Sequence, residues 1–268
     1  MSNGLDLENL ISGLRRNRKV YIYESPLVSK DPDWLKCQER EKAFWKHKIN
    51  HTDYNPDPKK NFMPFLGHWG IAPSFFKGKS VLEIGSGPFG FFSGLERMNP
   101  DYLPEELVVV DALLDFYQQF KLSDMMPEKA IRLETVGEDI PLPDETFDAI
   151  VTTNTLDHVQ DYDALLRESR RLLKEGGTLL FSVHALKGIF AFFRPFVKIA
   201  DATHHYHFTA DDVRRLMDEN FFALESSLSV PVYREDAIPC ELGPMKKVVY
   251  FIGFCLMGTF YGTARKKP

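Results

Sequence analysis

The residues best suited to hold a ligand lie just after the first buried strand that the sequence predicts. Residues 80–84 form a short apolar run, and residues 83–90 read EIGSGPFG, which has the spacing GxGxxG. Its glycines permit a tight turn and let the backbone approach a ligand closely. Asp111 ends the next apolar run, roughly 20 residues further on, where a carboxylate can accept hydrogen bonds from ribose hydroxyls. Both a dinucleotide and S-adenosylmethionine fit this pattern.

Further apolar runs supply the elements that must position this loop. Strands are expected at residues 80–84, 107–111, 131–136, 147–153 and 178–183, with two late strands at 222–230 and 258–264. Helical patterns lie between them, and the clearest, at residues 162–174, is ended by two glycines. Strands that alternate with helices predict βαβ units and a parallel sheet. Because the strands are apolar throughout, both faces of the sheet should be covered.

In these elements the chain resembles the class I S-adenosylmethionine-dependent methyltransferases, and in particular methyltransferase domains of type 11. The resemblance covers roughly residues 79–220. It is carried, in the family's order, by VLEIGSGP at 81–88 with Asp111, EDIPLPDETFD at 138–148, NTLDHV at 154–159 and LLKEGGTL at 172–179. A nicotinamide-dependent reductase is not expected to show the last three blocks together. We therefore expect an α/β, Rossmann-like, mainly parallel seven-stranded sheet with helices on both faces and a reversed edge strand near 258–264.

The resemblance implies a role for each matching position in binding S-adenosylmethionine. The two glycines of the loop line the methionine moiety, Glu83 lies near the amino group of the cofactor, and Asp111 holds the ribose. Many relatives have an acidic residue for the adenine where this chain has Val136, so either Glu138 or Asp139 takes that role. The implied cofactor-binding residues are Glu83, Gly85, Ser86, Gly87, Asp111, Ala112, Gly137, Glu138 and Asn154.

Histidines near the expected carboxyl edge of the sheet are the candidates for the acceptor side. His184 follows the fifth strand, and His205 lies in the run HHYH before the next helix, so each is a candidate general base or acceptor contact. His158, Phe190 and His207 are candidate substrate contacts. The alternatives are a structural role for His158, loop packing for His184 and helix packing on the sheet for Phe190. For the run HHYH, which holds His205 and His207, they are a metal site or a role in shaping the acceptor pocket. A base is needed only if the acceptor must lose a proton.

Two aromatic segments flank this region and are expected to cover the site. Residues 1–75 form an N-terminal helical and aromatic cover, with one helix at about 33–50, and residues 76–268 form the cofactor-binding domain. An acceptor-side insertion is expected at about 185–208. Both segments favour an apolar, aromatic or amine-bearing acceptor, since aromatic faces bind cations. The expected function is methyl transfer to O, N or C of a small molecule; the alternatives are a catalytically silent S-adenosylmethionine-binding protein or transfer of another group.

Composition limits the remaining functional classes. The chain has 268 residues and a net charge of -5, and it lacks the basic stripe of a nucleic-acid reader. Its three cysteines are far apart, which predicts neither disulfides nor a metal site. The most apolar run, 248–257, is well short of the ~20 residues that span a bilayer. We expect a cytoplasmic monomer or homodimer without integral membrane contact.

Overall fold

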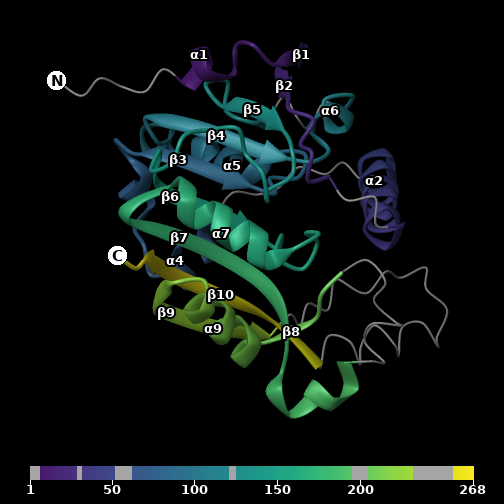
Figure 1. Ribbon diagram of the computed structural model, residues 1–268, viewed down its shortest axis with the longest axis vertical. Helices are drawn as coiled ribbons and strands as arrows, with labels where there is room; N and C mark the ends of the chain where they lie inside the picture. The colour runs from purple at the N-terminus through teal and green to yellow at the C-terminus, as the bar shows by residue number, and fades with distance from the viewer. Residues whose placement is uncertain (1–6, 29–31, 52–61, 121–124, 195–204, 232–255) are drawn as a thin grey trace.

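The computed structural model of the chain describes residues 7–28, 32–51, 62–120, 125–194, 205–231 and 256–268. Within these ranges, ten strands form one sheet in the order β1-β2-β5-β4-β3-β6-β7-β10-β9, with β8 paired to β7 (Figure 1). The strands are β1 Arg15–Asn17, β2 Val20–Ile22, β3 Ser80–Ile84, β4 Glu106–Asp111, β5 Ile131–Glu134, β6 Phe147–Thr153, β7 Leu173–Leu186, β8 Phe208–Thr209, β9 Phe222–Pro231 and β10 Met257–Lys266.

The five central strands, β5, β4, β3, β6 and β7, all run parallel. From β3 the chain moves outward through β4 to β5, and it then returns to the other side of β3 to form β6 and β7. Open α/β sheets bind ligands at the carboxyl ends of their strands, where the strand order reverses in this way. The predicted Rossmann-like α/β fold is therefore confirmed, and its reversal lies between β3 and β6.

The two edges of the sheet differ from the predicted arrangement in detail. Strand β10 is antiparallel to both of its neighbours, which confirms the reversed strand, but β9 lies outside it and forms the edge. At the other edge a hairpin of β1 and β2 joins β5. These two strands have three residues each, too few to show a two-residue period. Together with the two-residue β8, they extend the seven expected strands.

Helices cover both faces of the sheet, as predicted. One hydrophobic core joins the sheet to α1, α7 and α9, and a second joins its other face to α4, α5 and α6. No helix in the described ranges is long and apolar enough to cross a bilayer. The helices and 3-10 turns are α1 Leu7–Ile11, α2 Pro32–His51, α4 Met63–Trp69, η1 Pro73–Phe76, α5 Gly90–Met98, η2 Pro100–Tyr102, α6 Leu114–Tyr117, α7 Tyr162–Leu172, η4 Gly188–Phe193 and α9 Ala210–Glu219.

Alternation along the strands explains why the apolar runs are continuous. Leu82 and Val108 belong to the core under α7, whereas their neighbours Val81 and Val109 belong to the core under α5. Successive side chains of a strand point to opposite faces of the sheet, and here both faces are buried.

Side-chain caps fix the starts of two helices that follow the central strands. Asp161 accepts a hydrogen bond from the N–H of Ala164, 3.0 Å away, at the start of α7. At α9, Thr209 and Asp212 form a reciprocal capping box. The sequence itself predicts a helix start here, since residues 209–212 read TADD, which is a capping signature, and the structure confirms it.

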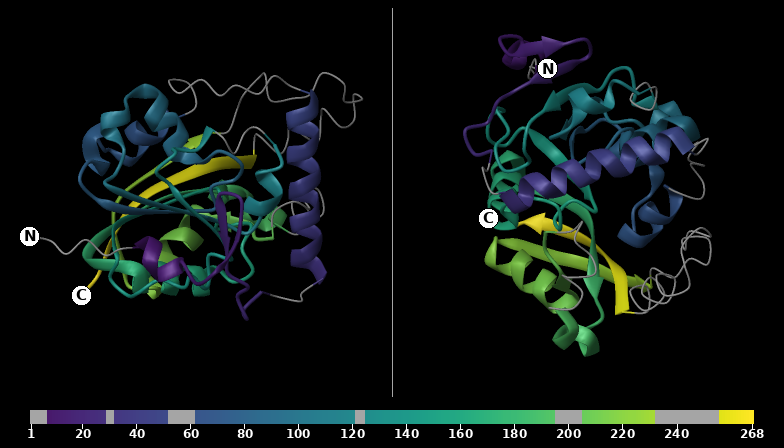
Figure 2. Two further views of the ribbon diagram at one scale, coloured as in Figure 1. Left: turned by 90° about the horizontal axis from the view of Figure 1, so that it is seen from above. Right: turned by 90° about the vertical axis from the view of Figure 1, so that its right-hand side faces the viewer.

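The first 75 residues contribute to several parts of the molecule. Helix α4 joins the core, where the Nε1–H of the buried Trp69 donates to the carbonyl of Phe181 at 2.8 Å. The hydroxyl of Thr263 on β10 in turn donates to the carbonyl of Trp69 at 2.9 Å. Helix α2 confirms the helix predicted at about 33–50, and it lies across the ends of the strands (Figure 2). The acceptor-side insertion expected at 185–208 is described only in part, because residues 195–204 lie outside the described ranges.

Candidate active site

A cavity of about 810 Å³ opens at the carboxyl edge of the sheet. Its walls come from the loops after β3, β4, β5 and β6, from β7, β9 and β10, and from α2 and α4. The volume lies within the roughly 300–1,000 Å³ of small-molecule sites. The structure brings together most of the predicted site residues here: Gly85, Ser86, Gly87, Asp111, Ala112, Gly137, Glu138, Asn154, His158 and His184.

The glycine loop after β3 requires glycine for both conformation and space. Gly85 and Gly87 have φ angles of 73° and 60°, in the left-handed region that favours glycine. A Cβ at Gly85 would lie 2.1 Å from Oγ1 of Thr155, in the loop that follows β6. The loop after β3 and the loop after β6 therefore pack directly against each other at the strand-order reversal.

Asp111 at the end of β4 joins the glycine loop to the next turn. Its Oδ2 accepts the N–H of Gly87 at 2.9 Å, and its Oδ1 accepts the N–H of Leu113 at 2.8 Å. Burial raises the pKa of Asp111 to about 6, and the nearby Glu41 adds to the rise, while the two N–H donors oppose it. A carboxylate has about four acceptor positions. Two of them are still available to hydroxyl donors from a ligand.

Glu83, predicted to lie near the cofactor's amino group, has its side chain under the glycine loop. Its side chain is only 2% exposed and does not line the described cavity. Its Oε1 accepts the N–H of Phe91 at 2.5 Å, at the start of α5, and a Cβ at Gly90 would lie 2.9 Å from its Oε2. Burial raises the pKa of Glu83 to about 8. Because it bonds to the backbone under the loop, Glu83 holds the loop in shape.

The loop after β5 holds Glu138 and Asp139, the two acidic candidates for contact with the adenine edge, and the structure places them differently. Glu138 lines the cavity, and its Oε1 accepts the N–H of Gln160 at 2.8 Å. Asp139 does not line the described cavity, and it instead accepts the hydroxyl of Ser25 at 2.6 Å. Gly137 has no room for a side chain, since a Cβ would lie 2.8 Å from Ile84 and from Leu165. Of the two acidic residues, Glu138 is therefore the one positioned to meet a ligand.

Asn154 closes the floor of the cavity at the end of β6. It has a φ of 51°, a left-handed conformation that asparagine adopts more readily than most residues other than glycine. Its N–H donates to the carbonyl of Ser182 on β7 at 2.9 Å, which holds this conformation.

One face of α2 forms a wall that the sequence analysis did not assign residue by residue. Trp34, Gln38, Glu41 and Trp45, at successive helical turns, all line the cavity. The Trp45 ring contacts the Phe89 ring beside the glycine loop, with centroids 5.8 Å apart. The spacing of these residues was the available signal, but only the fold shows which face of the helix meets the cavity.

The far end of the cavity is lined by aromatic rings and by His184. The ring of Tyr261 on β10 lies 5.5 Å from that of Phe65 and 4.3 Å from that of His68, both on α4. Nδ1 of His184 lies 3.6 Å from Oδ2 of Asp157, which is buried. No local sequence pattern predicts this grouping, because its members come from four separate segments of the chain.

The remaining predicted acceptor residues are placed differently. His205 does not line the described cavity: its N–H donates to the carbonyl of Asp157 at 2.7 Å, and its ring packs on Tyr206. His207 is 8% exposed and also lies off the cavity, because it enters the core just before β8. Phe190 falls in η4, and its side chain lies outside the described part of the structure.

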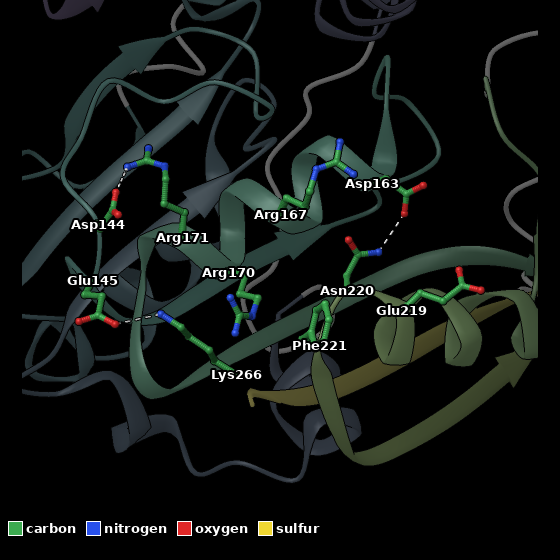
Figure 3. Close-up of a pocket in the computed structure, with 10 residues that line it drawn as sticks. All are labelled: Asp144, Glu145, Asp163, Arg167, Arg170, Arg171, Glu219, Asn220, Phe221 and Lys266. Carbon is green, nitrogen blue, oxygen red and sulfur yellow. Dashed lines mark hydrogen bonds and ion pairs between the residues drawn. The ribbon is translucent and has the colours of Figure 1, made fainter. Parts of the chain in front are cut away.

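A second cavity, of about 850 Å³, lies along α7 and beside the end of α9 (Figure 3). Two of its basic residues pair with acidic residues that also line it: Arg171 lies 2.6 Å from Asp144, and Lys266 lies 3.2 Å from Glu145. None of the predicted site residues lines it. The candidate active site is therefore the cavity at the carboxyl edge.

A mainly parallel sheet with an antiparallel β10, and with a glycine loop and an acidic residue at its strand-order reversal, is the arrangement expected of a class I S-adenosylmethionine-dependent methyltransferase. Comparison with known families gives the same result, because residues 56–227 match a family model described as a methyltransferase domain. The chain belongs to this methyltransferase domain family.

Curated relatives match parts of the chain. An arsenite methyltransferase of Aquipseudomonas alcaligenes is 31% identical over 121 residues, which cover 42% of this chain and 34% of the relative. A ubiquinone/menaquinone biosynthesis C-methyltransferase of a Caulobacter species is 34% identical over 106 residues, covering 33% and 41%. The chain thus matches well under two thirds of the length of these relatives.

Solved structures share the fold at low sequence identity. The 4+2 cyclase SpnF superposes with a TM-score of 0.63 and 14% identity, covering 88% of this chain and 96% of its own. A putative sarcosine dimethylglycine methyltransferase from Galdieria sulphuraria has a TM-score of 0.61 and 12% identity, covering 85% and 98%. These likenesses describe the fold alone.

Proposed function

We propose that this chain transfers a methyl group from S-adenosylmethionine to a small-molecule acceptor. The observation that carries the proposal is the bond between Asp111 and Gly87, which fixes the loop at the mouth of a cavity of suitable volume. The curated relatives named above carry the names of enzymes that methylate small molecules, which supports a small acceptor here. A cytoplasmic location and a monomeric or dimeric state are part of this proposal.

The residues present fit the cofactor. Gly85 and Gly87 keep the loop in a left-handed conformation without side chains, so its backbone can approach a ligand closely. The carboxylate of Asp111 has acceptor capacity for the ribose. Glu138 lines the adenine end, Asn154 forms the floor, and Ser86 and Ala112 complete the wall between them. When bound, the cofactor supplies a methyl group on a positively charged sulfur that needs no further activation.

The protein's own task is then to align the acceptor and to keep water away. Alignment of reacting groups accounts for much of the rate of such transfers. Helix α2 covers the cofactor end, and the rings of Phe65 and Tyr261 enclose the far end. These aromatic walls favour an apolar or aromatic acceptor, with an amine-bearing one as the alternative. His158 lines the cavity next to Trp34, whose indole donates to the His158 carbonyl at 3.2 Å, and is proposed as a substrate contact.

Calorimetric titration with S-adenosylmethionine and S-adenosylhomocysteine tests this proposal directly. Both should bind, and Asp111→Ala should weaken binding by about a factor of ten or more, since a charged hydrogen-bonding partner contributes roughly 1.5–3 kcal/mol. Asp139→Ala is the matched control, because this neighbouring acid does not line the described cavity. A folded protein that binds neither ligand would contradict the proposal. Binding without methylated product across a broad acceptor panel would point to a silent binding protein.

A further inference from the structure

At the acceptor end of the cavity, the partly exposed His184 lies beside the buried Asp157. Nδ1 of His184 lies 3.6 Å from Oδ2 of Asp157. The Asp157 side chain is 1% exposed, whereas that of His184 is 24% exposed and lines the cavity. Because Nδ1 itself is a buried atom, the exposed part of the imidazole lies in the rest of the ring, which includes Nε2. Catalytic contacts are often long in unliganded structures and tighten when substrate binds.

Both members of the pair are held by the fold. The carbonyl of Asp157 accepts N–H groups from His205 at 2.7 Å and Tyr206 at 3.1 Å, which fixes the loop after β6. His184 lies within β7, between β6 and β10, where it pairs with Thr259. A carboxylate at Nδ1 favours the tautomer with a proton on Nδ1 and a lone pair on Nε2. The pair is thus built to present a basic nitrogen to the cavity.

The walls around this nitrogen are flat and aromatic. Tyr261 packs between Phe65 and His68, and all three line the cavity with His184. His68 is not equivalent to His184: its Nδ1 is buried without a hydrogen-bond partner, and among the described residues no carboxylate lies within 4 Å of it. A planar ring fits this space better than a flexible chain, since aromatic rings prefer edge and offset-face contacts.

We propose that His184, positioned by Asp157, is the general base for an acceptor that bears a phenolic hydroxyl. This inference rests on the proposed function. The phenolic O–H proton passes to Nε2 of His184 as the oxygen attacks the methyl carbon in line. The new O–CH₃ bond forms, the S–CH₃ bond breaks, and its electron pair stays on sulfur as the neutral thioether. The imidazolium that results is stabilised by the Asp157 carboxylate and returns its proton to solvent.

Nuclear magnetic resonance of ¹⁵N-histidine-labelled protein tests the pair without any acceptor. The resonances of His184 are assigned as those that are missing from the spectrum of His184→Gln. With saturating S-adenosylhomocysteine, the His184 ring should carry its proton on Nδ1. Asp157→Asn should shift the tautomer toward Nε2–H. An Nε2–H tautomer in the wild type, or no change in Asp157→Asn, would overturn the pairing. His184→Gln should bind S-adenosylhomocysteine within about twofold of the wild type, a difference below 1 kcal/mol; loss of binding would place His184 in the cofactor site instead.

Phenols with nitro, fluoro or methoxy substituents, and matching anilines, test the base and the acceptor class. The wild type should methylate phenols on oxygen and leave the anilines unchanged. His184→Gln should lower kcat by about 100-fold or more, and Asp157→Asn by about 10- to 100-fold, with KM little changed. The loss in His184→Gln should shrink as the phenol becomes more acidic, because an acidic phenol needs less help to lose its proton. A purely structural role for His184 would give the same loss for every phenol.

The outcomes separate this inference from the proposed function. Three results would each contradict the assignment of His184 as the general base. They are methylation of the anilines, a complete lack of phenol methylation, and a loss of kcat in His205→Gln as large as that in His184→Gln. If the wild type does not bind S-adenosylhomocysteine at all, the result contradicts the proposed methyltransferase function itself and not only the role of His184.

Discussion

The carboxylate of Asp111 at the end of β4 holds the N–H of Gly87 at 2.9 Å, across the gap between two adjacent loops. The same carboxylate is partly buried, and the loss of water around it raises its pKa to about 6. The contact that shapes the loop therefore uses a group that titrates just below neutral pH.

We expect the affinity for S-adenosylmethionine to fall as the pH drops through about 6, the raised pKa of Asp111. The charged form accepts hydrogen bonds from ribose hydroxyls, and protonation removes acceptor capacity, so affinity is full above this pKa and lost below it. Calorimetry between pH 5 and 8 measures the trend. Asp111→Asn should bind weakly and without this dependence; a wild-type affinity that is flat across the range would contradict the assignment.

Glu41 on α2 should tune this same titration. It contributes to the raised pKa of Asp111 through like-charge repulsion, and its Oε1 accepts the indole N–H of Trp45 at 2.7 Å. Replacing Glu41 with Gln removes the charge and keeps an acceptor for Trp45. The pH at which cofactor affinity falls should therefore move lower. Glu39→Gln is the control, since Glu39 is exposed on α2 and does not line the cavity.

Alanine substitutions at Gly85 and Gly70 distinguish the cost of backbone strain from the cost of a steric clash. Both have a positive φ, 73° and 69°, but a Cβ at Gly70 meets nothing within 4 Å, whereas one at Gly85 meets Thr155 at 2.1 Å. Gly70→Ala should cost about 1–2 kcal/mol of unfolding free energy, and Gly85→Ala about 2–5 kcal/mol. Urea denaturation measures both. Equal losses would mean that the loop after β6 moves away freely.

Glu83 should make stability fall with rising pH. Its pKa is raised to about 8 in the folded state against an ordinary value of 4.5, so its stabilising effect is complete below pH 4.5 and is lost as the pH rises toward 8. Glu83→Gln cannot ionise and should gain stability relative to the wild type over this window. Thermal unfolding of both proteins at pH 5 and pH 8 checks this direction. A stability difference between Glu83→Gln and the wild type that shrinks as the pH rises would contradict the prediction.

Trp69 and Trp34 should respond differently to the same substitution. Trp69→Phe removes a bond to Phe181 in the central sheet and leaves space in the core, which should cost about 1–3 kcal/mol in urea denaturation. Trp34→Phe removes a comparable bond from α2 to His158, at the wall of the cavity. Its main effect should be weaker cofactor binding. Equal effects on global stability would show that α2 is part of the folding core.

The central strands, α2, the start of α9 and the glycine loop were all predicted from the sequence. Their signals are local: continuous apolar runs, helical spacing, and the cap at Thr209 each depend on residues within one or two turns. β1 and β2 were missed because three-residue strands carry no period, and their pairing with β5 depends on residues more than 100 positions away. The position of Glu83 in the motif does not reveal that its carboxylate turns under Gly90, because the motif leaves the direction of the side chain open.

By itself, the sequence determined the loops that are proposed to hold the cofactor, because a strand, a glycine turn and an acidic strand end impose their geometry over a short stretch of chain. Only the tertiary structure decided which side chains share the acceptor half. His184, Asp157, His68 and Tyr261 meet there because strand order places β7 between β6 and β10, and packing lays α4 beside them. The same packing places His205 away from the cavity, where its backbone N–H donates to the carbonyl of Asp157. Contacts between distant segments depend on strand order and register, and no local pattern of residues encodes either.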